Sequence, residues 1–209
     1  NQFAHQRQPD AAIDGAEQLG WLMAAEVLAS GFDFSFAPVL DVDADFCSVI
    51  GDRSFSDSPE AVTMIARAFI AGMRSAGMAA TGKHFPGHGG VHGDSHLELP
   101  TDSRDWQTLL DRDLKPFIAL SDQLAGVMPA HILFPAIDAT HPVGFSQRWL
   151  KDKLRAELGF AGVIFSDDLT MEGAAAVGGY TQRASAALDA GCDMVLVCNY
   201  RQGAVEVLE

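Results

Sequence analysis

Apolar residues recur at helical spacing in several stretches of the chain, and these stretches have recognisable ends. The first covers residues 10–30 and stops where a glycine follows it. The second begins at Ser58, a good N-cap, with Pro59 at the first helical position, and stops at Gly77. Further helical patterns cover residues 102–122, 146–159, 180–190 and 202–209. The spacing therefore predicts six helices, and Pro116 is a point at which the third can be interrupted.

Short apolar runs separate these helices and have the composition of buried strands. They cover residues 34–42, 78–83, 126–131, 162–166 and 193–199. Strict alternation of strand and helix predicts a parallel sheet with helical crossovers. An open doubly wound sheet and a (β/α)8 barrel both satisfy this alternation. No G-x-G-x-x-G phosphate-binding pattern follows a strand, which argues against a nucleotide-binding doubly wound fold.

Nearly every predicted strand ends in polar or ionisable residues. These are Asp41 and Asp43, Lys83 and His84, His131, Asp167 and Asp168, and Asn199. A barrel gathers the carboxyl ends of its strands around one mouth, where active sites form, so this pattern favours the (β/α)8 barrel. Five strands of the eight are visible. We therefore expect residues 1–209 to be a single catalytic α/β barrel domain truncated at both ends, which agrees with a start at Asn1 and an end inside the sixth helix.

The overall composition is that of a soluble globular domain with a large core, since 48% of the 209 residues are hydrophobic and 20% are charged. No apolar run approaches the length that crosses a bilayer, so we expect no membrane partner. The net charge of −14 argues against nucleic acid or an anionic membrane surface as a partner. Three cysteines are too few for a disulfide framework, which favours a reducing compartment and buried thiols.

One loop is unusually rich in histidine and glycine. The stretch GKHFPGHGGVHGDSH, residues 82–96, has a histidine at every fourth position, which on a helix would form a metal-binding stripe. Pro86 and the four glycines that follow it exclude a helix, so the spacing has no such geometric meaning. The segment is instead expected to be a long loop that follows a strand.

A second segment delivers two adjacent carboxylates to the expected mouth of the barrel. The apolar strand at 162–166 ends directly before Asp167 and Asp168. Because neighbouring residues at a strand end point in different directions, one carboxylate can face a reaction centre while the other turns aside. A carboxylate held there suits attack on a sugar carbon, stabilisation of an oxocarbenium ion, or metal binding. The alternative is that Asp168 caps the helix that follows.

Two long motifs carry a family resemblance. K-H-F-P-G-H-G-x4-D-S-H at 83–96, followed by F-S-D-D-L-T-M-E-G at 165–173, closely resembles the family 3 glycoside hydrolases, in their bacterial β-N-acetylglucosaminidase (β-hexosaminidase) branch. Segments 36–43, 49–55 and 127–131 extend the resemblance to essentially the whole chain. The resemblance implies a (β/α)8-type barrel, in agreement with the strand ends. It also implies retaining hydrolysis of terminal β-linked GlcNAc from peptidoglycan fragments, as in muropeptide recycling.

The resemblance also implies roles for individual residues. Asp167 matches the nucleophile that forms a covalent glycosyl-enzyme, and His96 matches the general acid/base, with Asp94 as its dyad partner. An unperturbed pKa near 6.5 suits a histidine for proton donation around neutrality. The residues that match binders of the sugar hydroxyls are Arg53, Lys83 and His84. On this interpretation His88 and His92 shape the loop.

What the resemblance implies for partners is equally specific. The substrate is expected to be a small carbohydrate, GlcNAc-anhydroMurNAc and its peptides, and no cofactor or metal is needed. A monomer is expected, and together with the cysteine count the family implies a cytoplasmic location.

Several alternatives remain open from the residues themselves. A family 3 phosphorylase is one, because a histidine acid/base repels incoming phosphate less than a carboxylate does. A metal-dependent barrel hydrolase is another, with His84, His131, Asp167 and Asp168 as ligands. Lys83 could instead form a Schiff base, and Arg53 could be a surface ion-pair residue. A non-catalytic sugar-binding fragment is the last, because the family contributes further sugar-site residues from upstream of Asn1.

Overall fold

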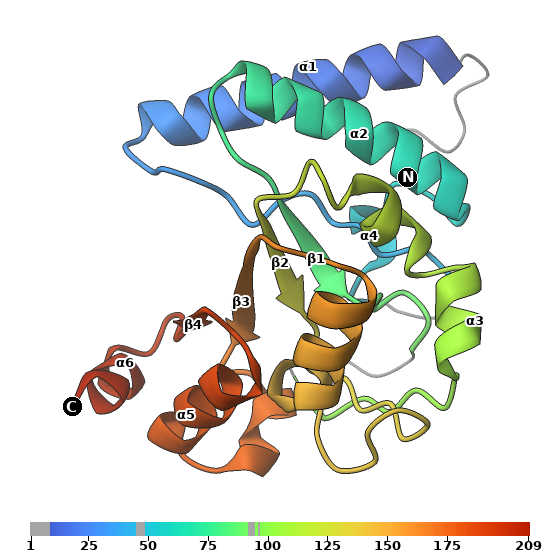
Figure 1. The fold of residues 1–209 in the computed structure, drawn as a ribbon. Coiled ribbons are helices and arrows are strands. Elements are labelled where there is room, and N and C mark those ends of the chain that lie inside the picture. Colours follow the sequence, from blue (N-terminus) through green and yellow to red (C-terminus); the bar gives the residue numbers. More distant parts are fainter. Residues whose placement is uncertain (1–8, 45–48, 92–94, 96) are drawn as a thin grey trace.

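The computed structural model describes residues 9–44, 49–91, 95 and 97–209, and every structural statement below concerns these residues. In this part of the chain, parallel strands alternate with helices (Figure 1). The strands are β1 (Thr81–Phe85), β2 (Gly126–Pro129), β3 (Val163–Asp168) and β4 (Met194–Leu196). The α-helices are α1 (Pro9–Ala29), α2 (Pro59–Ser75), α3 (Trp106–Asp111), α4 (Lys115–Leu120), α5 (Tyr180–Ala190) and α6 (Arg201–Leu208). Three 3₁₀ turns, η1 (Gly51–Arg53), η2 (Val143–Phe145) and η4 (Glu172–Val177), and a wider helix, η3 (Arg148–Glu157), complete the described elements.

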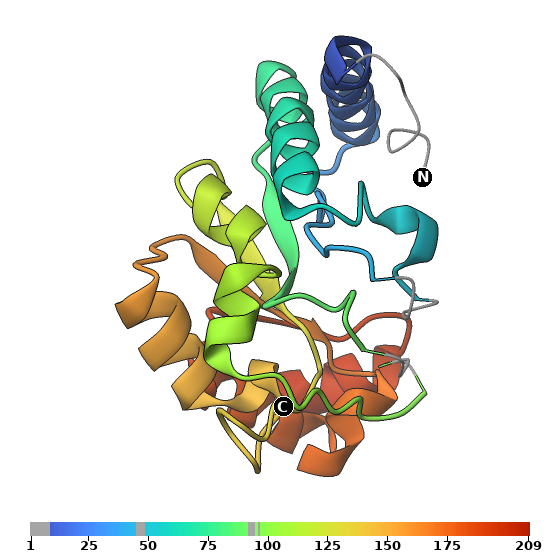
Figure 2. The same cartoon turned by 90° about the vertical axis from the view of Figure 1, so that its right-hand side faces the viewer.

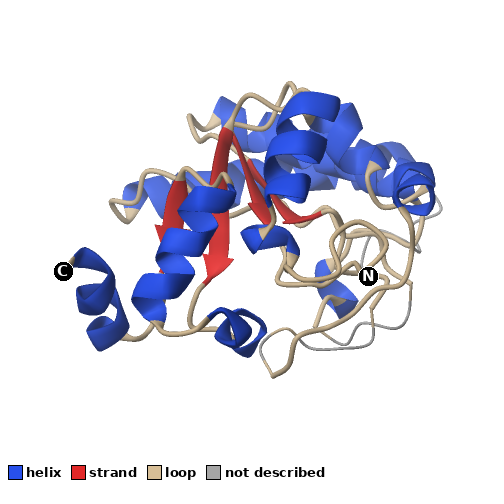
Figure 3. Cartoon of the chain, turned by 60° about the horizontal axis from the view of Figure 1, so that its bottom comes forward, coloured by secondary structure: helices blue, strands red, loops and turns tan. Residues whose placement is uncertain are grey.

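The sheet has its strands in chain order, β1-β2-β3-β4, and every neighbouring pair is parallel. Helices surround these strands in Figure 3, as crossover connections require. A doubly wound sheet reverses its strand order at a switch point, whereas a barrel adds strands sequentially. The chain therefore folds as part of a TIM-type α/β barrel, as the polar strand ends predicted.

The predicted strand at 34–42 is wrong as a regular strand, although its position is right. The segment runs beside β1, where the Leu40 N–H donates to the Lys83 carbonyl oxygen at 2.6 Å, but only Val39 makes a β-bridge. The Lys83 N–H donates to the Pro38 carbonyl oxygen at 3.2 Å. Pro38 itself has no N–H to donate, so the hydrogen-bond ladder beside β1 stays incomplete.

The helices follow the predicted pattern closely, with one division. Ser58 caps α2 as expected, its hydroxyl accepting the Ala61 N–H at 3.3 Å. The predicted helix at 102–122 is two shorter helices, α3 and α4, and Pro116 lies in the first turn of α4, where its missing N–H is not needed. Among the described residues, no helix has the length and apolarity that a membrane span would require.

The core is built around Trp149 of η3, whose side chain is fully buried. Its ring contacts the rings of Phe85, Phe134 and Trp106, with centroids 5.2–5.9 Å apart. Phe85 ends β1, so this aromatic cluster fixes η3 against the strand that carries Lys83 and His84.

Helices α1 and α2 lie side by side along one flank of the molecule in both Figure 1 and Figure 2. Two buried glycines, Gly20 of α1 and Gly72 of α2, allow this close approach. A Cβ atom at Gly72 would lie 2.7 Å from the backbone nitrogen of Trp21 and would overlap the carbonyl oxygen of Glu17. The helix pair therefore depends on backbone-to-backbone contact.

We expect Gly72→Ala to lower the free energy of unfolding by about 1–3 kcal/mol, because the added methyl forces the helix backbones apart. Helix propensity alone predicts the opposite sign, a gain of about 1 kcal/mol. Urea denaturation measures the difference, and Ala71→Gly, at a half-buried position of the same helix, calibrates the propensity term. A Gly72→Ala protein that is more stable than wild type would contradict the close-contact explanation.

Candidate active site

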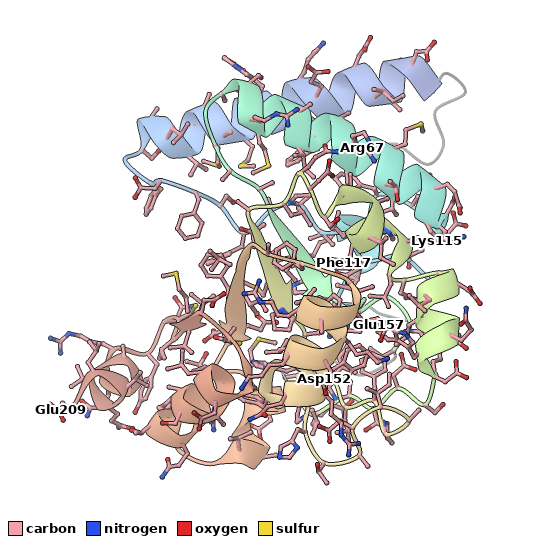
Figure 4. The ribbon with its side chains drawn as sticks, in the orientation of Figure 1. Arg67, Lys115, Phe117, Asp152, Glu157 and Glu209 are labelled. Carbon is pink, nitrogen blue, oxygen red and sulfur yellow. The ribbon has the colours of Figure 1, made fainter. Side chains whose placement is uncertain are left out.

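A small cavity of about 140 Å³ lies where β1 and β3 end. Its lining residues are Val49, Ile50, Arg53, Lys83, His84, His88, Ser95, Asp167 and Met171. A larger groove, of about 760 Å³, lies between α1, α2 and α4, but its lining is mainly apolar. Figure 4 shows Arg67 and Lys115 of that groove projecting from α2 and α4. The smaller cavity combines a carboxylate with imidazole, ammonium and guanidinium groups, so it is the candidate active site among the described residues.

The two adjacent carboxylates at the end of β3 have different surroundings. Asp167 lines the cavity, and its Oδ1 accepts the N–H of Asp168 at 2.8 Å. The Asp168 carboxylate accepts hydrogen bonds from the N–H and hydroxyl of Thr170 and from the Cys198 N–H, at 2.7–3.0 Å. The prediction that the two carboxylates face different surroundings is confirmed. Asp168 does not cap a helix: its carboxylate stabilises the turn at Thr170 and binds the backbone at Cys198, just after β4.

Two basic residues lie on the cavity wall with Asp167. Lys83 comes from β1 and is half-buried, and Arg53 comes from η1. Burial lowers the pKa of the Lys83 ammonium group, and the nearby Arg53 charge lowers it further, while Asp167 and Asp41 oppose the shift. The structure therefore brings Arg53, Lys83 and Asp167 within electrostatic reach of one another, although they are far apart in sequence.

His84 lies on the same wall and is held by a carboxylate behind it. Its Nδ1 is 2.7 Å from Oδ2 of Asp41, and the Asp41 side chain is fully buried. Burial by itself raises the pKa of Asp41, but the His84 charge and the hydrogen bonds from His84 and His88 outweigh it and lower the pKa. The sequence predicts Asp41 only as the end of a strand and does not predict its pairing with His84. The segment 36–43 runs beside the strand that carries His84, and this adjacency is what could have indicated the pair.

Two further residues of the His-rich loop, His88 and Ser95, also have hydrogen-bond partners. The His88 ring Nε2 is 3.0 Å from the Ser95 hydroxyl, and the Ser95 carbonyl oxygen accepts the Gly173 N–H at 3.0 Å. Burial lowers the pKa of His88, with Asp41 opposing, so the ring is neutral at neutral pH. This geometry supports a shaping role for His88. The predicted dyad residues Asp94 and His96, and His92, lie outside the described residues.

His131 is fully buried and lies behind the cavity wall. Its Nε2 is 3.2 Å from the carbonyl oxygen of Asp168, and its ring stacks on Phe145 with centroids 5.2 Å apart. Burial lowers its pKa, so it too is neutral at neutral pH. The suggested metal ligands His84, His131, Asp167 and Asp168 thus have separate partners, and in the described chain no three His, Cys, Asp or Glu side chains are arranged to hold a metal ion.

An ion cluster that sequence reasoning missed supports the base of the loop. The Arg104 guanidinium binds Asp102 in a bidentate manner and donates to Asp113 Oδ2 at 2.6 Å. The Asp113 side chain is fully buried. A Cβ at Gly90 would collide with the Arg104 guanidinium, and one at Gly89 with the Val42 carbonyl oxygen. The loop glycines are therefore needed for close packing as well as for chain conformation.

Comparisons with known proteins point to one family. The family model for the Glycosyl hydrolase family 3 N terminal domain matches residues 2–209. A beta-hexosaminidase from Methylococcus capsulatus is 59% identical over 201 residues, which is 96% of this chain and 60% of that protein. A beta-hexosaminidase from Pseudomonas aeruginosa is 56% identical over 189 residues, which is 90% of this chain and 57% of that protein. The chain thus spans somewhat more than half the length of these relatives.

Solved structures agree. NagZ from Neisseria gonorrhoeae, in complex with N-trifluoroacetyl-D-glucosamine, has a TM-score of 0.87 and 51% identity, over 94% of this chain and 56% of that one. A family 3 beta-N-acetylglucosaminidase from Paenibacillus sp. has a TM-score of 0.88 and 35% identity, over 92% of this chain and 37% of that one. These matches confirm the resemblance indicated by the two sequence motifs.

We expect Arg104→Met to lower the free energy of unfolding by about 3–5 kcal/mol, because it leaves the buried Asp113 carboxylate without its closest charged partner. Urea denaturation measures the loss, and Arg67→Met, at an exposed guanidinium with one hydrogen bond to a backbone carbonyl, is the control, with a loss of about 1 kcal/mol or less. Adding Asp113→Asn to Arg104→Met should recover part of the stability. If the double variant is no more stable than Arg104→Met, the unpaired charge of Asp113 is not the cause.

Proposed function

Because this chain belongs to glycosyl hydrolase family 3, through the N-terminal domain of that family, we propose that the protein is a retaining exo-β-N-acetylglucosaminidase. The observation that carries the proposal is the cavity of about 140 Å³ in which the Asp167 carboxylate shares a wall with Lys83, Arg53 and His84. A cavity of this size suits one terminal sugar ring, with a nucleophile and several donors for its hydroxyl groups. The ligand of the gonococcal relative, an N-acylated glucosamine derivative, supports GlcNAc as that sugar.

The proposed reaction is a double displacement. Asp167 attacks the anomeric carbon and forms a glycosyl ester, while His96 donates a proton to the leaving oxygen as the glycosidic bond breaks. Water then attacks the same carbon, His96 takes its proton, and the ester bond to Asp167 breaks. Two inversions give net retention. Asp94 would orient the His96 ring and stabilise its imidazolium form, as an aspartate does for histidine in other triads.

The other cavity residues would bind and orient the sugar. Lys83 and Arg53 offer N–H donors to the hydroxyl groups, and His84 offers one ring nitrogen while Asp41 holds the other. Val49, Ile50 and Met171 form the apolar part of the wall and would contact the carbon faces of the ring. Fixing the sugar in this way places its anomeric carbon for attack by Asp167.

We propose that the substrate is a small peptidoglycan fragment, GlcNAc-anhydroMurNAc with or without its peptide, in a cytoplasmic recycling route. The net charge of −14 fits a small neutral or weakly charged ligand better than a polyanion. The reaction needs no cofactor or metal, and we expect the whole protein to act as a monomer.

An activated 5-fluoro-GlcNAc glycoside should label full-length protein covalently at Asp167, because fluorine slows hydrolysis of the glycosyl ester. Peptide mapping by mass spectrometry locates the adduct. Asp167→Asn should abolish labelling, whereas Asp168→Asn, the adjacent control outside the cavity lining, should still be labelled. An adduct on any other residue, or an active protein that stays unlabelled, would refute Asp167 as the nucleophile. Product analysis with and without phosphate separates hydrolysis from phosphorolysis.

His96→Ala should lower kcat/KM on an unactivated disaccharide by about 10²–10⁴-fold, because the leaving oxygen then departs without a proton donor. A nitrophenyl glycoside needs less proton assistance for bond cleavage and should lose less. His92→Ala, which removes a histidine from the same loop, is the matched control and should keep both activities. Equal losses on both substrates would argue against His96 as the acid.

A further inference from the structure

The buried Asp41 carboxylate makes all its described side-chain hydrogen bonds to one short segment, the K-H-F-P-G-H run. Its Oδ2 pairs with the His84 ring at 2.7 Å. Its Oδ1 accepts two backbone N–H groups, from His84 at 3.2 Å and from His88 at 2.7 Å. The Asp41 side chain has no exposed surface. A carboxylate so placed fixes the ring of a cavity residue and the backbone of the turn that follows it.

The backbone around Asp41 is itself fixed from two sides. On one side, the Leu40 N–H donates to the Lys83 carbonyl oxygen at 2.6 Å, which ties the segment to β1. On the other, the Ser54 hydroxyl donates to the Asp41 carbonyl oxygen at 2.7 Å, directly beside Arg53. Asp41 therefore connects the wall that carries Lys83 and His84 with the turn that carries Arg53.

The pairing with His84 has a consequence for proton position. A carboxylate only accepts hydrogen bonds, so the His84 Nδ1 must carry a proton whether the ring is neutral or charged. The other nitrogen, Nε2, is left for the cavity that His84 lines. An asparagine at position 41 could turn its NH₂ towards Nδ1, which would make Nδ1 the acceptor and move the proton of a neutral ring to Nε2.

A second chain of contacts runs from Asp41 into the His-rich loop. Asp41 holds the His88 N–H, the His88 ring lies 3.0 Å from the Ser95 hydroxyl, and the Ser95 carbonyl oxygen accepts the Gly173 N–H. Ser95 lies in sequence between Asp94 and His96. The contacts thus lead from one buried carboxylate to the neighbour of the proposed general acid/base.

We propose that Asp41 is the positioning residue of this site: it sets the proton on His84 that decides what the ring offers to the sugar, and it anchors the start of the loop that carries the proposed acid/base. The proposal rests on the proposed function only where it says that His84 and His96 act on a sugar. Proton position on His84 can be measured without any substrate.

The first measurement is of His84 itself, in full-length protein labelled with ¹⁵N-histidine. Long-range ¹H–¹⁵N spectra report which ring nitrogen carries the proton, and His84→Gln assigns the signals. Wild type is expected to carry the proton on Nδ1, and Asp41→Asn to carry it on Nε2. A wild-type His84 with a neutral ring protonated on Nε2 would overturn the proposal, even if Asp41→Asn does not fold.

The second measurement is of kinetics. Loss of a charge-assisted hydrogen bond should lower kcat/KM of Asp41→Asn about tenfold to a hundredfold, mainly through KM. Asp138→Asn is the matched control, because Asp138 is also a buried carboxylate with several hydrogen-bond donors but lies outside the cavity. The control should lose stability while the folded protein keeps its kcat/KM and its His84 proton on Nδ1.

The outcomes distinguish a failure of the positioning role of Asp41 from a failure of the proposed function. A moved proton together with a raised KM supports the positioning role. Equal kinetic losses in Asp41→Asn and Asp138→Asn, with the proton unmoved, would reduce Asp41 to a structural residue and overturn the role. A wild type that does not hydrolyse GlcNAc glycosides would refute the proposed function, and the proton measurement would still decide whether Asp41 sets the state of His84.

Discussion

The parallel direction of the strands is the constraint on which the site depends. Since β1, β2 and β3 all run the same way, their carboxyl ends meet at one edge of the sheet, and residues far apart in sequence become neighbours there. Lys83 and Asp167 share a cavity wall for this reason alone. The aromatic cluster around Trp149 packs the end of β1 against η3, beside the strand residues that line the cavity.

The carboxylates near this edge of the sheet differ mainly in which groups donate hydrogen bonds to them. Asp41 and Asp113 are buried, and each accepts hydrogen bonds from two residues, His84 and His88 for Asp41 and Arg104 and Arg112 for Asp113. Asp168 is used by a turn and by the backbone leading out of β4. Asp167 faces the cavity, and Asp168 supplies one N–H to it. Of these four carboxylates, Asp167 is the one that faces the cavity, while the other three hold its surroundings in place.

Much of this arrangement could be predicted from the sequence, because periodicity and strand ends are local signals. They identify α1, α2 and α5, the parallel sheet, and the barrel. The two motifs identify the family. Local signals fail where a single residue changes the backbone: Pro38 interrupts the segment beside β1, and Pro116 begins a separate helix.

The hydrogen-bond partners of individual buried side chains could not be predicted. Asp41 pairs with a histidine that is 43 residues away in the chain, and the Arg104 cluster lies under a loop with which it shares no sequence pattern. The loop glycines predict that the segment is not a helix. They do not predict the close packing of Gly89 against Val42 and of Gly90 against Arg104, which depends on the tertiary structure.

That packing has a consequence for engineering the cavity of this protein. A side chain at Gly89 would meet the Val42 carbonyl oxygen and one at Gly90 the Arg104 guanidinium, so substitutions there would disturb the packing under the loop. Val49, Ile50 and Met171 line the cavity and belong to neither the ion cluster nor the Asp41 hydrogen bonds. Changes in volume at these three positions would therefore alter the shape of the cavity while leaving its polar framework intact.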